Sequence, residues 1–406
     1  MRSIEEHRKK IASLVENALA ARGSYEHALE AGFQAGAILA ERVVSALDLP
    51  PFDNSQMDGY AVNSTDLQAG PRVLDVAARI PAGHAPEPLV RGTAAPIMTG
   101  APMPRGADAV VQIERADPAR FLPEGGDQRV LLPGVEPGGF VRTRGSDIRA
   151  GDLLFAEGTV LGAAQWGSLV AAGVDTVRLV KPPRILLVST GEELAESGVR
   201  LDPGKIYDAN GASLSAALEA AGAQIEFERV GDSPEELLAR VGRHPEVDLV
   251  VTTGGVSEGA YEVVREAFGD RGVTFGSVAM QPGGPQGWGH LSLDDLVVPV
   301  VCFPGNPVSA LISFEAFLRE PLLHAVARSL SRRESTAILA EGADSPPAKH
   351  QLRRGRLDGD GAVHFVGGPS SHLLHAYAQA THLVHLPVGV ARVEAGDEVV
   401  VWALDE

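Results

Sequence analysis

Hydrophobic spacing predicts a helix at the start of the chain. Ile4, Ile11 and Leu14 recur at the three- and four-residue intervals of one helical face. Ser3, followed three residues later by Glu6, spells a capping box. We therefore expect the first helix to begin directly after Ser3.

The rest of the N-terminal and linker region, residues 1–177, contains helical stretches and an inserted subdomain. Residues 35–46 show helical spacing that stops before two prolines, and residues 163–172 predict another helix. Between them, short β-like runs such as residues 72–76 and 109–113 are separated by many Gly and Pro residues. This pattern predicts a small β-rich subdomain at about residues 54–140.

Residues 178–330 show a more regular alternation. Continuous apolar runs alternate with helical patterns, as in a parallel sheet that helices cover on both faces. The pattern predicts a doubly wound, mostly parallel α/β domain. The expected strands are residues 184–189, 224–230, 248–253 and 297–303, and the expected helices are residues 211–221, 234–242, 260–268 and 306–329.

The end of the chain predicts a smaller domain. Residues 343–348 are rich in Pro and small residues and are typical of a linker. Residues 345–406 contain short β-like runs such as residues 398–402, which predict a small β domain. The fold class is therefore α/β with several domains.

Charge narrows the classes of partner. The 35 basic and 53 acidic residues leave a formal net charge of −18, and only 5% of the residues are aromatic. That balance repels phosphate backbones and leaves few rings for base stacking, so we expect no nucleic-acid partner. A small polyanionic ligand would need a divalent cation or a local cluster of positive charge.

Cysteine content and hydropathy indicate the compartment. The single cysteine, Cys302, excludes an intrachain disulfide and a zinc site built from several thiolates. The first ten residues are charged and lack the apolar core of a signal peptide, and apolar runs such as residues 297–303 are too short to span a bilayer. We expect a cytoplasmic protein without a membrane span.

Four loops of unusual content follow the predicted strands of the middle domain. Parallel strands end at one edge of a sheet, so we expect these loops to meet there. Their glycines and hydroxyls let backbone amides approach an anion, and their carboxylates are ligands for a hard cation. Each loop alone is better explained as turn or cap chemistry, and only their coincidence indicates a small-molecule anion site. The loops are residues 189–193, 231–233, 252–259 and 303–307.

Other enzyme classes leave weaker signals. The segment from Gly198 to Lys205 has one residue too many for a Walker A loop, and Ile206 stands where Ser or Thr is required. Residues 255–259 spell the G-x-S-x-G nucleophile elbow, so a hydrolase that uses Ser257 stays an alternative. Its acid and histidine partners are not identifiable from spacing.

Histidines crowd the C-terminal region and raise the question of a metal site. With no cysteine nearby, and with the last pair on opposite faces of any strand, solvated or core histidines are the favoured interpretation. The residues are His372, His375, His382 and His385.

Taken in order, the motifs of this chain resemble those of the MoeA and gephyrin E-domain family of molybdopterin molybdenumtransferases. The most specific is P-F-D-N-S-Q-M-D-G-Y-A-V at residues 51–62. The resemblance covers nearly the whole chain. The other motifs are M-T-G-A-P at 98–102, G-S-D-I at 145–148, S-T-G-E-E-L at 189–194, T-G-G-V-S at 253–257, P-G-N-P at 304–307, R-G at 354–355 and S-H at 371–372.

This resemblance implies a reaction and an architecture. Adenylated molybdopterin, molybdate and Mg²⁺ meet, the phosphoanhydride is cleaved, AMP leaves and molybdenum is placed on the dithiolene sulfurs. The implied architecture has a MoaB/Mog-like middle domain, a β-rich subdomain inserted in an elongated linker region and a β-barrel-like C-terminal domain. It also implies a homodimer whose active cleft joins the N-terminal part of one chain to the middle domain of the other.

The resemblance also assigns roles to individual residues. Asp232 and Glu262 are expected to bind Mg²⁺ or to position a water, with Glu193 supporting, because carboxylates around a pyrophosphate are unfavourable without a cation between them. Arg354 and Ser371 are expected to help hold molybdate. The implied catalytic positions are Asp58, Asp147, Asp232, Glu193 and Glu262, and the implied substrate-binding positions are Thr99, Thr190, Gly254, Gly255, Ser257, Pro304, Gly305, Asn306, Arg354 and Ser371.

The chain departs from the family pattern where charge matters. Glu262 stands where the well-known members carry Asp, and Gln281 and Gly284 stand where they often carry lysines. Arg265, at the position of another usual lysine, keeps its positive charge. Losing two cations should weaken anion binding or raise the dependence on Mg²⁺.

The missing lysines also favour a second hypothesis, a gephyrin-like dimeric scaffold that works mainly by binding another protein. The retained carboxylates oppose it, because a pure scaffold has no physical need for dispersed acidic groups around one cleft. We therefore favour the transferase.

Overall fold

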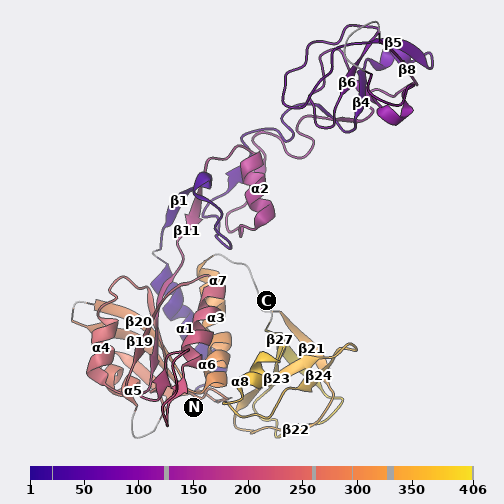
Figure 1. Cartoon of the computed structure of the whole chain (residues 1–406). Coiled ribbons are helices and arrows are strands. Elements are labelled where there is room, and N and C mark those ends of the chain that lie inside the picture. Colours follow the sequence, from indigo (N-terminus) through magenta and orange to yellow (C-terminus); the bar gives the residue numbers. More distant parts are fainter. Residues whose placement is uncertain (21, 123–127, 258–261, 295, 327–332, 405–406) are drawn as a thin grey trace. The chain divides into compact units, whose positions relative to one another are not determined.

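The computed structural model describes residues 1–20, 22–122, 128–257, 262–294, 296–326 and 333–404. Two compact units make up the chain (Figure 1). One unit comprises Met1–Tyr25, Gly36–Ala40 and Leu179–Glu406, and the other comprises Glu26–Ala35 and Glu41–Arg178.

The unit containing Glu41–Arg178 holds the predicted β-rich subdomain. Its five-stranded sheet has the order β7-β4-β6-β5-β8. Alternate side chains such as Leu74, Val130 and Leu132 are buried in a common core with Tyr60, as the two-residue period of a strand requires. The strands are β4 (Gly59–Val62), β5 (Arg72–Val76), β6 (Thr93–Ile97), β7 (Ala109–Gln112) and β8 (Arg129–Leu132).

The segments around this subdomain correct one prediction. The helix at residues 163–172 is confirmed as α2 (Ala163–Ala171), but the helix expected at residues 35–46 is wrong. Gly36 adopts a left-handed φ of 73°, which ends any helix. The β-branched pair Val43–Val44 instead forms β2, which pairs with β10 (Leu153–Phe155).

The N-terminal helix packs into the other unit. The capping box is confirmed at the start of α1 (Ile4–Leu19), because Ser3 Oγ accepts from the Glu6 amide at 3.1 Å and Glu6 Oε2 accepts from the Ser3 amide at 3.0 Å. Ile11 and Leu14 are buried in the core of the middle domain. The sequence grouped this helix with the linker region, whereas its apolar face is covered by α7 (Arg319–Ala325) and β20 (Leu296–Phe303).

The middle domain contains the predicted parallel strands in one six-stranded sheet, ordered β15-β12-β16-β20-β19-β17. The first four strands are parallel, and β19 pairs antiparallel with both β20 and β17. The sequence patterns did not indicate the last two strands of this order. The bounds are β12 (Arg184–Thr190), β15 (Gln224–Val230), β16 (Leu249–Thr253), β17 (Val273–Ser277) and β19 (Pro285–Leu293).

Helices cover both faces of this sheet, as predicted (Figure 1). On β12, Leu187 packs with α3 (Ala209–Ala220) and α6 (Pro307–Ser313), while Leu186 and Val188 pack on the opposite side. That second face is covered by α4 (Pro234–Val241) and α5 (Val263–Phe268). Successive side chains of one strand therefore supply two separate cores, which explains why a central strand such as β12 carries a continuous apolar run.

The long closing helix expected at residues 306–329 is interrupted. Between α6 and α7 the chain forms a π-helical turn, Phe314–Leu318. Residues 327–329 of the expected helix lie outside the described residues. The apolar side chains stay buried across the interruption, and the π-helical turn and α7 pack against α1 while α6 packs against α3.

The C-terminal domain is a closed barrel. Its strands follow the order β23-β24-β21-β27-β25, and β25 pairs back onto β23. The linker interpretation of residues 343–348 is wrong, because Ala343–Asp344 forms β22 and pairs with β26 (Arg392–Val393). The barrel strands are β21 (Glu334–Leu339), β23 (His350–Leu357), β24 (Ala362–Phe365), β25 (His382–Leu386) and β27 (Glu398–Ala403).

Candidate functional site

The described parts of the four predicted loops meet at one edge of the middle sheet, and residues 258–259 of the third loop lie outside the described residues. Thr190, Val230, Thr253 and Phe303 are the last residues of β12, β15, β16 and β20. Thr190 pairs with Val230, and Thr253 pairs with both Ser189 and Phe303 across the parallel strands. The carboxyl ends of all four strands therefore open on the same side, where an open α/β sheet places its ligand.

These loops line a pocket of about 650 Å³. Four carboxylates face it, and no lysine or arginine is among the described residues that line it. We call it the acidic pocket. Of the expected site residues, Thr190, Glu193, Asp232, Gly254, Gly255, Ser257, Glu262, Pro304, Gly305 and Asn306 line it, together with Asp208, Asn210, Thr253, Ser309 and His372.

Close backbone approach explains the glycines of the acidic pocket. Gly254 has a left-handed φ of 96°, and a Cβ at this position would lie 2.6 Å from the Thr190 carbonyl oxygen. Asn210 ties the neighbouring loops together, since its Nδ2 donates to Thr253 Oγ1 at 3.0 Å and to the Gly305 carbonyl at 2.7 Å. The pocket wall is thus fixed before any ligand binds.

Glu262 uses its longer side chain to reach back along its own loop. One of its carboxylate oxygens, Oε2, accepts a hydrogen bond from the Ser257 amide at 2.8 Å. This contact holds the carboxylate at the pocket wall. The Ser257 amide is therefore engaged within the chain.

Asp208 is a pocket residue that the sequence motifs did not single out. It is the N-cap of α3, where its Oδ1 accepts from the Gly211 amide at 2.8 Å and from Ser189 Oγ at 3.2 Å. Arg229 forms an ion pair with Asp208, with the Arg229 Nε lying 3.3 Å from the Asp208 Oδ2. Capping spacing before a helix was the available signal, and it indicates structure as readily as function.

A second pocket of about 580 Å³ adjoins the first. The two share Val256, Ser257, Pro285 and Ser309. Its lining has the opposite sign, because Arg265 and Lys349 contribute positive charge and no carboxylate is among the described lining residues. We call it the cationic pocket. Its hydroxyl groups come from Ser257, Ser277, Ser309, Ser370 and Ser371.

Ser371 and Arg354, the expected molybdate ligands, differ in placement. Ser371 lines the cationic pocket, and its carbonyl accepts from the Val308 amide at the start of α6 at 3.0 Å. Arg354 is not among the described residues that line either pocket. Its guanidinium donates to the carbonyls of Val366, Gly368 and Ser370, so it holds the loop that carries Ser371.

The remaining expected residues lie in the other unit. Asp58 precedes β4 and Thr99 follows β6, and these strands pair antiparallel with Gly59 opposite Ile97. Thr99 donates to Asp58 Oδ1 from both its amide and its hydroxyl. These two hydrogen bonds hold the pKa of the Asp58 carboxyl below its usual range. Asp147 is exposed, and its amide donates to the Leu49 carbonyl at 2.9 Å.

The structure gives the hydrolase alternative no support. Ser257 Oγ has no hydrogen bond to a histidine among the described residues, and His372, which lines the same pocket, contacts Ser370 Oγ through Nδ1 at 2.8 Å. Cys302 is no substitute nucleophile, since burial raises the pKa of its thiol to about 12.

The four histidines of the C-terminal region do not form one cluster. His385 is buried against Trp402 and hydrogen-bonded to His350. His375 and His382 instead contact Gln379 and Thr381. These contacts agree with the interpretation as core and solvated histidines.

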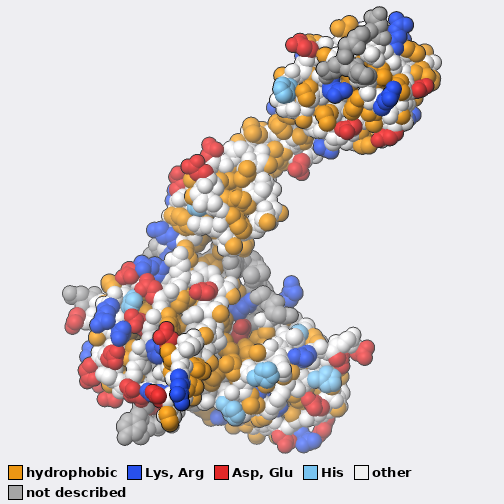
Figure 2. All heavy atoms as spheres, in the orientation of Figure 1, with side chains coloured by type: hydrophobic (Ala, Val, Ile, Leu, Met, Phe, Trp, Pro, Cys, Tyr) orange, Lys and Arg blue, Asp and Glu red, His pale blue; other side chains and the backbone are white. Residues whose placement is uncertain are grey.

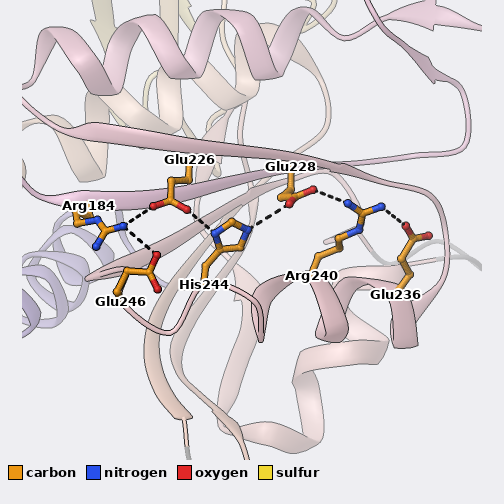
Figure 3. Close-up of polar contacts among 7 residues, drawn as sticks. All are labelled: Arg184, Glu226, Glu228, Glu236, Arg240, His244 and Glu246. Atoms are coloured by element: carbon orange, nitrogen blue, oxygen red, sulfur yellow. Dashed lines mark hydrogen bonds and ion pairs between the residues drawn. The ribbon is translucent and has the colours of Figure 1, made fainter.

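A different group of side chains has metal-ligand spacing. Donor atoms of Glu226, His244 and Glu246 lie within 4.8 Å of one another. Arg184 Nη2 already contacts both glutamates, at 2.7 and 2.9 Å, and His244 bridges Glu226 and Glu228 (Figure 3). This cluster lies at the amino ends of β12 and β15, opposite the acidic pocket. It is a closed ion-pair network, so it carries no metal assignment.

Outside the two pockets, acidic and basic side chains occur together. Acidic and basic side chains are interspersed on the visible surface of the middle domain (Figure 2). The separation of sign between the two adjoining pockets is therefore a local property of their lining residues. None of the described helices is both long and apolar enough to cross a membrane.

Family models match three consecutive parts of the chain. Residues 2–173 match the MoeA N-terminal region, residues 186–324 match a probable molybdopterin binding domain, and residues 336–404 match the MoeA C-terminal region. Molybdopterin molybdenumtransferase 2 of Mycobacterium tuberculosis is 40% identical over the full length of both chains. Molybdopterin molybdenumtransferase 1 of the same organism is 35% identical, covering 98% of this chain and 97% of its own.

A solved structure supports the same assignment. The molybdopterin biosynthesis MoeA protein of Pyrococcus horikoshii superimposes with a TM-score of 0.77 at 30% identity, covering 98% of this chain and 99% of its own. Fold, site and relatives together define a multidomain transferase of molybdenum cofactor biosynthesis. The chain belongs to the MoeA family of molybdopterin molybdenumtransferases. The enzymatic interpretation is thus confirmed.

Proposed function

We propose that this protein inserts molybdenum from molybdate into adenylated molybdopterin, with Mg²⁺ as the cation and AMP as the leaving product. One observation carries the proposal: an acidic pocket adjoins a cationic pocket lined by serines, and the two share a wall. Such a pair suits a substrate whose phosphates need a cation on one side and an oxyanion that needs positive charge on the other.

The donor set of the acidic pocket fits Mg²⁺. Asp232, Glu262 and Glu193 offer carboxylate oxygens, the hard ligands that this ion prefers. We assign Asp232 and Glu262 as its protein ligands and Glu193 as a supporting carboxylate. When bound, the ion would offset charge on the phosphates and on the departing AMP.

The chain's own residues position the substrate. The Gly254–Gly255 loop has no side chains between its backbone and the pocket, which permits close approach of a phosphate or a pterin. Two positions at the start of α6 offer no amide to a ligand. Pro307 has no amide hydrogen, and the Val308 amide already donates to Ser371.

The cationic pocket is the proposed site for molybdate. Ser371, Ser370 and Ser257 place hydroxyl groups around it, and Arg265 adds a guanidinium. Arg354 supports this site indirectly, because its bonds to three carbonyls order the loop before Ser371. This revises the expected role of Arg354 from a direct ligand to a positioning residue.

We further propose that the protein works as a homodimer in the cytoplasm. The dimer follows from the family resemblance, in which Asp58, Thr99 and Asp147 also belong to the reacting site. The cytoplasmic location rests on the single buried cysteine. Light scattering checks the first statement, and a molar mass of one chain at assay concentration would contradict it.

The decisive experiment measures AMP release from adenylated molybdopterin with molybdate and Mg²⁺. We expect turnover by the unchanged protein and a loss of at least about tenfold in Asp232→Asn, which removes a proposed metal ligand. Asp270→Asn is the matched control, because Asp270 is exposed at the end of α5 and away from both pockets. Molybdate-dependent AMP release that Asp232→Asn leaves intact would overturn the assignment.

A further inference from the structure

We propose that Lys349 binds the oxyanion in the cationic pocket and, with Arg265, sets the affinity of this pocket for molybdate. The proposal rests on the proposed function, since it names a residue that this function needs. No sequence motif singled out Lys349.

Strand pairing brings Lys349 to the pocket. In the parallel pair of β18 (Met280–Gln281) and β23, Met280 lies opposite His350 and Gln281 opposite Gln351. The His350 amide also donates to the Ala279 carbonyl at 2.9 Å, which ties the residue after Lys349 to this segment. Lys349 is therefore held beside residues 279–285, although nearly 70 positions separate it from them in the sequence.

Lys349 directly precedes β23, in a turn where its amide donates to the Pro346 carbonyl at 3.0 Å. Gln351, two residues further on, donates from Nε2 to Gln281 Oε1 at 2.8 Å, and Gln281 lines the cationic pocket. Lys349 itself lines this pocket, while His350 and Leu352 line a separate, smaller one.

The positive charge of Lys349 makes it a candidate ligand for an oxyanion. Arg265 and Lys349 are the two charged side chains in the described lining, in a chain whose formal net charge is −18. Neither makes an ion pair with an acidic residue in the described part of the chain. Arg265 is partly engaged, because its Nη1 donates to the Ser257 carbonyl at 3.2 Å. The ammonium of Lys349 is thus the second positive charge that an oxyanion would meet there.

The neighbouring segment, residues 281–284, cannot supply that charge. Gln281 is neutral and its side-chain oxygen accepts from Gln351. Gly284 has no side chain, yet a Cβ built there would meet only ordinary contacts, the nearest at 3.5 Å. A lysine at position 284 would therefore fit, and this gives a way to place the charge at a second position of the pocket lining.

The test is calorimetric titration of the full-length protein with sodium molybdate, without nucleotide. We expect Lys349→Gln to raise the Kd about tenfold, as loss of one charge-assisted contact does. Lys9→Gln, on the exposed face of α1, should leave the Kd unchanged. Gly284→Lys should restore affinity when combined with Lys349→Gln. Circular dichroism of each variant verifies folding.

The outcomes separate this proposal from the proposed function. A Kd for Lys349→Gln within twofold of that for Lys9→Gln overturns the role of Lys349, even if AMP release proceeds normally. An unchanged protein that binds no molybdate overturns it as well. Molybdate binding that depends on Lys349, in a protein that releases no AMP, supports the oxyanion site and contradicts only the proposed reaction.

Discussion

Thr99 donates two hydrogen bonds to the same oxygen of Asp58. Its amide and its hydroxyl both donate to Asp58 Oδ1, at 2.7 and 2.8 Å. The two residues are 41 positions apart, and the antiparallel pairing of β4 with β6 brings them together. On the other side of β4, Gly59 permits the pairing with β7, because a Cβ there would lie 2.0 Å from the Val111 carbonyl oxygen. The glycine of the family motif is thus needed by the sheet itself.

The Asp58–Thr99 contact predicts a change in titration. Both hydrogen bonds favour the ionised carboxylate and lower its pKa, so Asp58 stays charged to lower pH than an ordinary aspartate. Thr99→Val removes the hydroxyl donor and keeps the amide, and we expect the pKa of Asp58 to rise toward its usual value. NMR titration of the labelled carboxyl measures this, with Thr65→Val as a control. An unchanged pKa would show that the hydroxyl bond does not form in solution.

Glu262 predicts a change in cation dependence. If this carboxylate is a ligand, Glu262→Gln should raise the Mg²⁺ concentration for half-maximal AMP release by about tenfold or more. Glu266→Gln, an exposed position on the same helix, is the matched control. Equal Mg²⁺ requirements for the two variants would remove Glu262 from the proposed ligand set.

Gly254 predicts a loss of stability. Gly254→Ala places a Cβ 2.6 Å from the Thr190 carbonyl oxygen at a left-handed φ, and we expect the free energy of unfolding to fall by about 2 kcal/mol or more. Gly269→Ala has nothing within 4 Å of the added carbon and a negative φ, so it isolates the steric effect. Urea unfolding of both variants gives the comparison. Equal midpoints would mean that the loop relaxes without cost.

The ion-pair network predicts a pH-dependent contribution to stability. Arg184, and after it His244, lowers the pKa of Glu226 (Figure 3). Because the folded-state pKa lies below the unfolded value, this stabilisation is present above the unfolded pKa and is lost as the pH falls through the folded one. Glu226→Gln should therefore destabilise the protein at pH 7, by less than about 1 kcal/mol, and lose its effect in acid. A constant difference at all pH values would contradict this.

Local sequence pattern predicted the middle domain well, because the residues that specify each of the predicted strands are consecutive in the chain. Runs such as residues 184–189 are apolar throughout, so burial on both faces is written into consecutive residues. The glycines and carboxylates that follow each strand were then assigned to one sheet edge by topology alone, and the structure confirms that edge. Family motifs added the residues in the other unit, which topology could not connect.

Predictions were wrong or incomplete where neighbouring residues in the sequence indicated little about the structure. Helical spacing at residues 35–46 was misleading because Gly36 and the pairing of Val43–Val44 outweighed it. Ala343–Asp344 looked like a linker because a two-residue strand has no pattern of its own. Asp208 looked like a helix cap, and it is one, but the cap also faces the acidic pocket.

The sequence by itself determined the fold class, the family and the loops that form the acidic pocket. Each of these depends on residues that are near neighbours along the chain or belong to a recognisable motif. Only the tertiary structure decided that Arg354 turns toward carbonyls and that Lys349 joins Arg265 and five serines around a second pocket. The reason is register: parallel pairing of β18 with β23 joins segments about 70 residues apart, and no local pattern specifies that alignment.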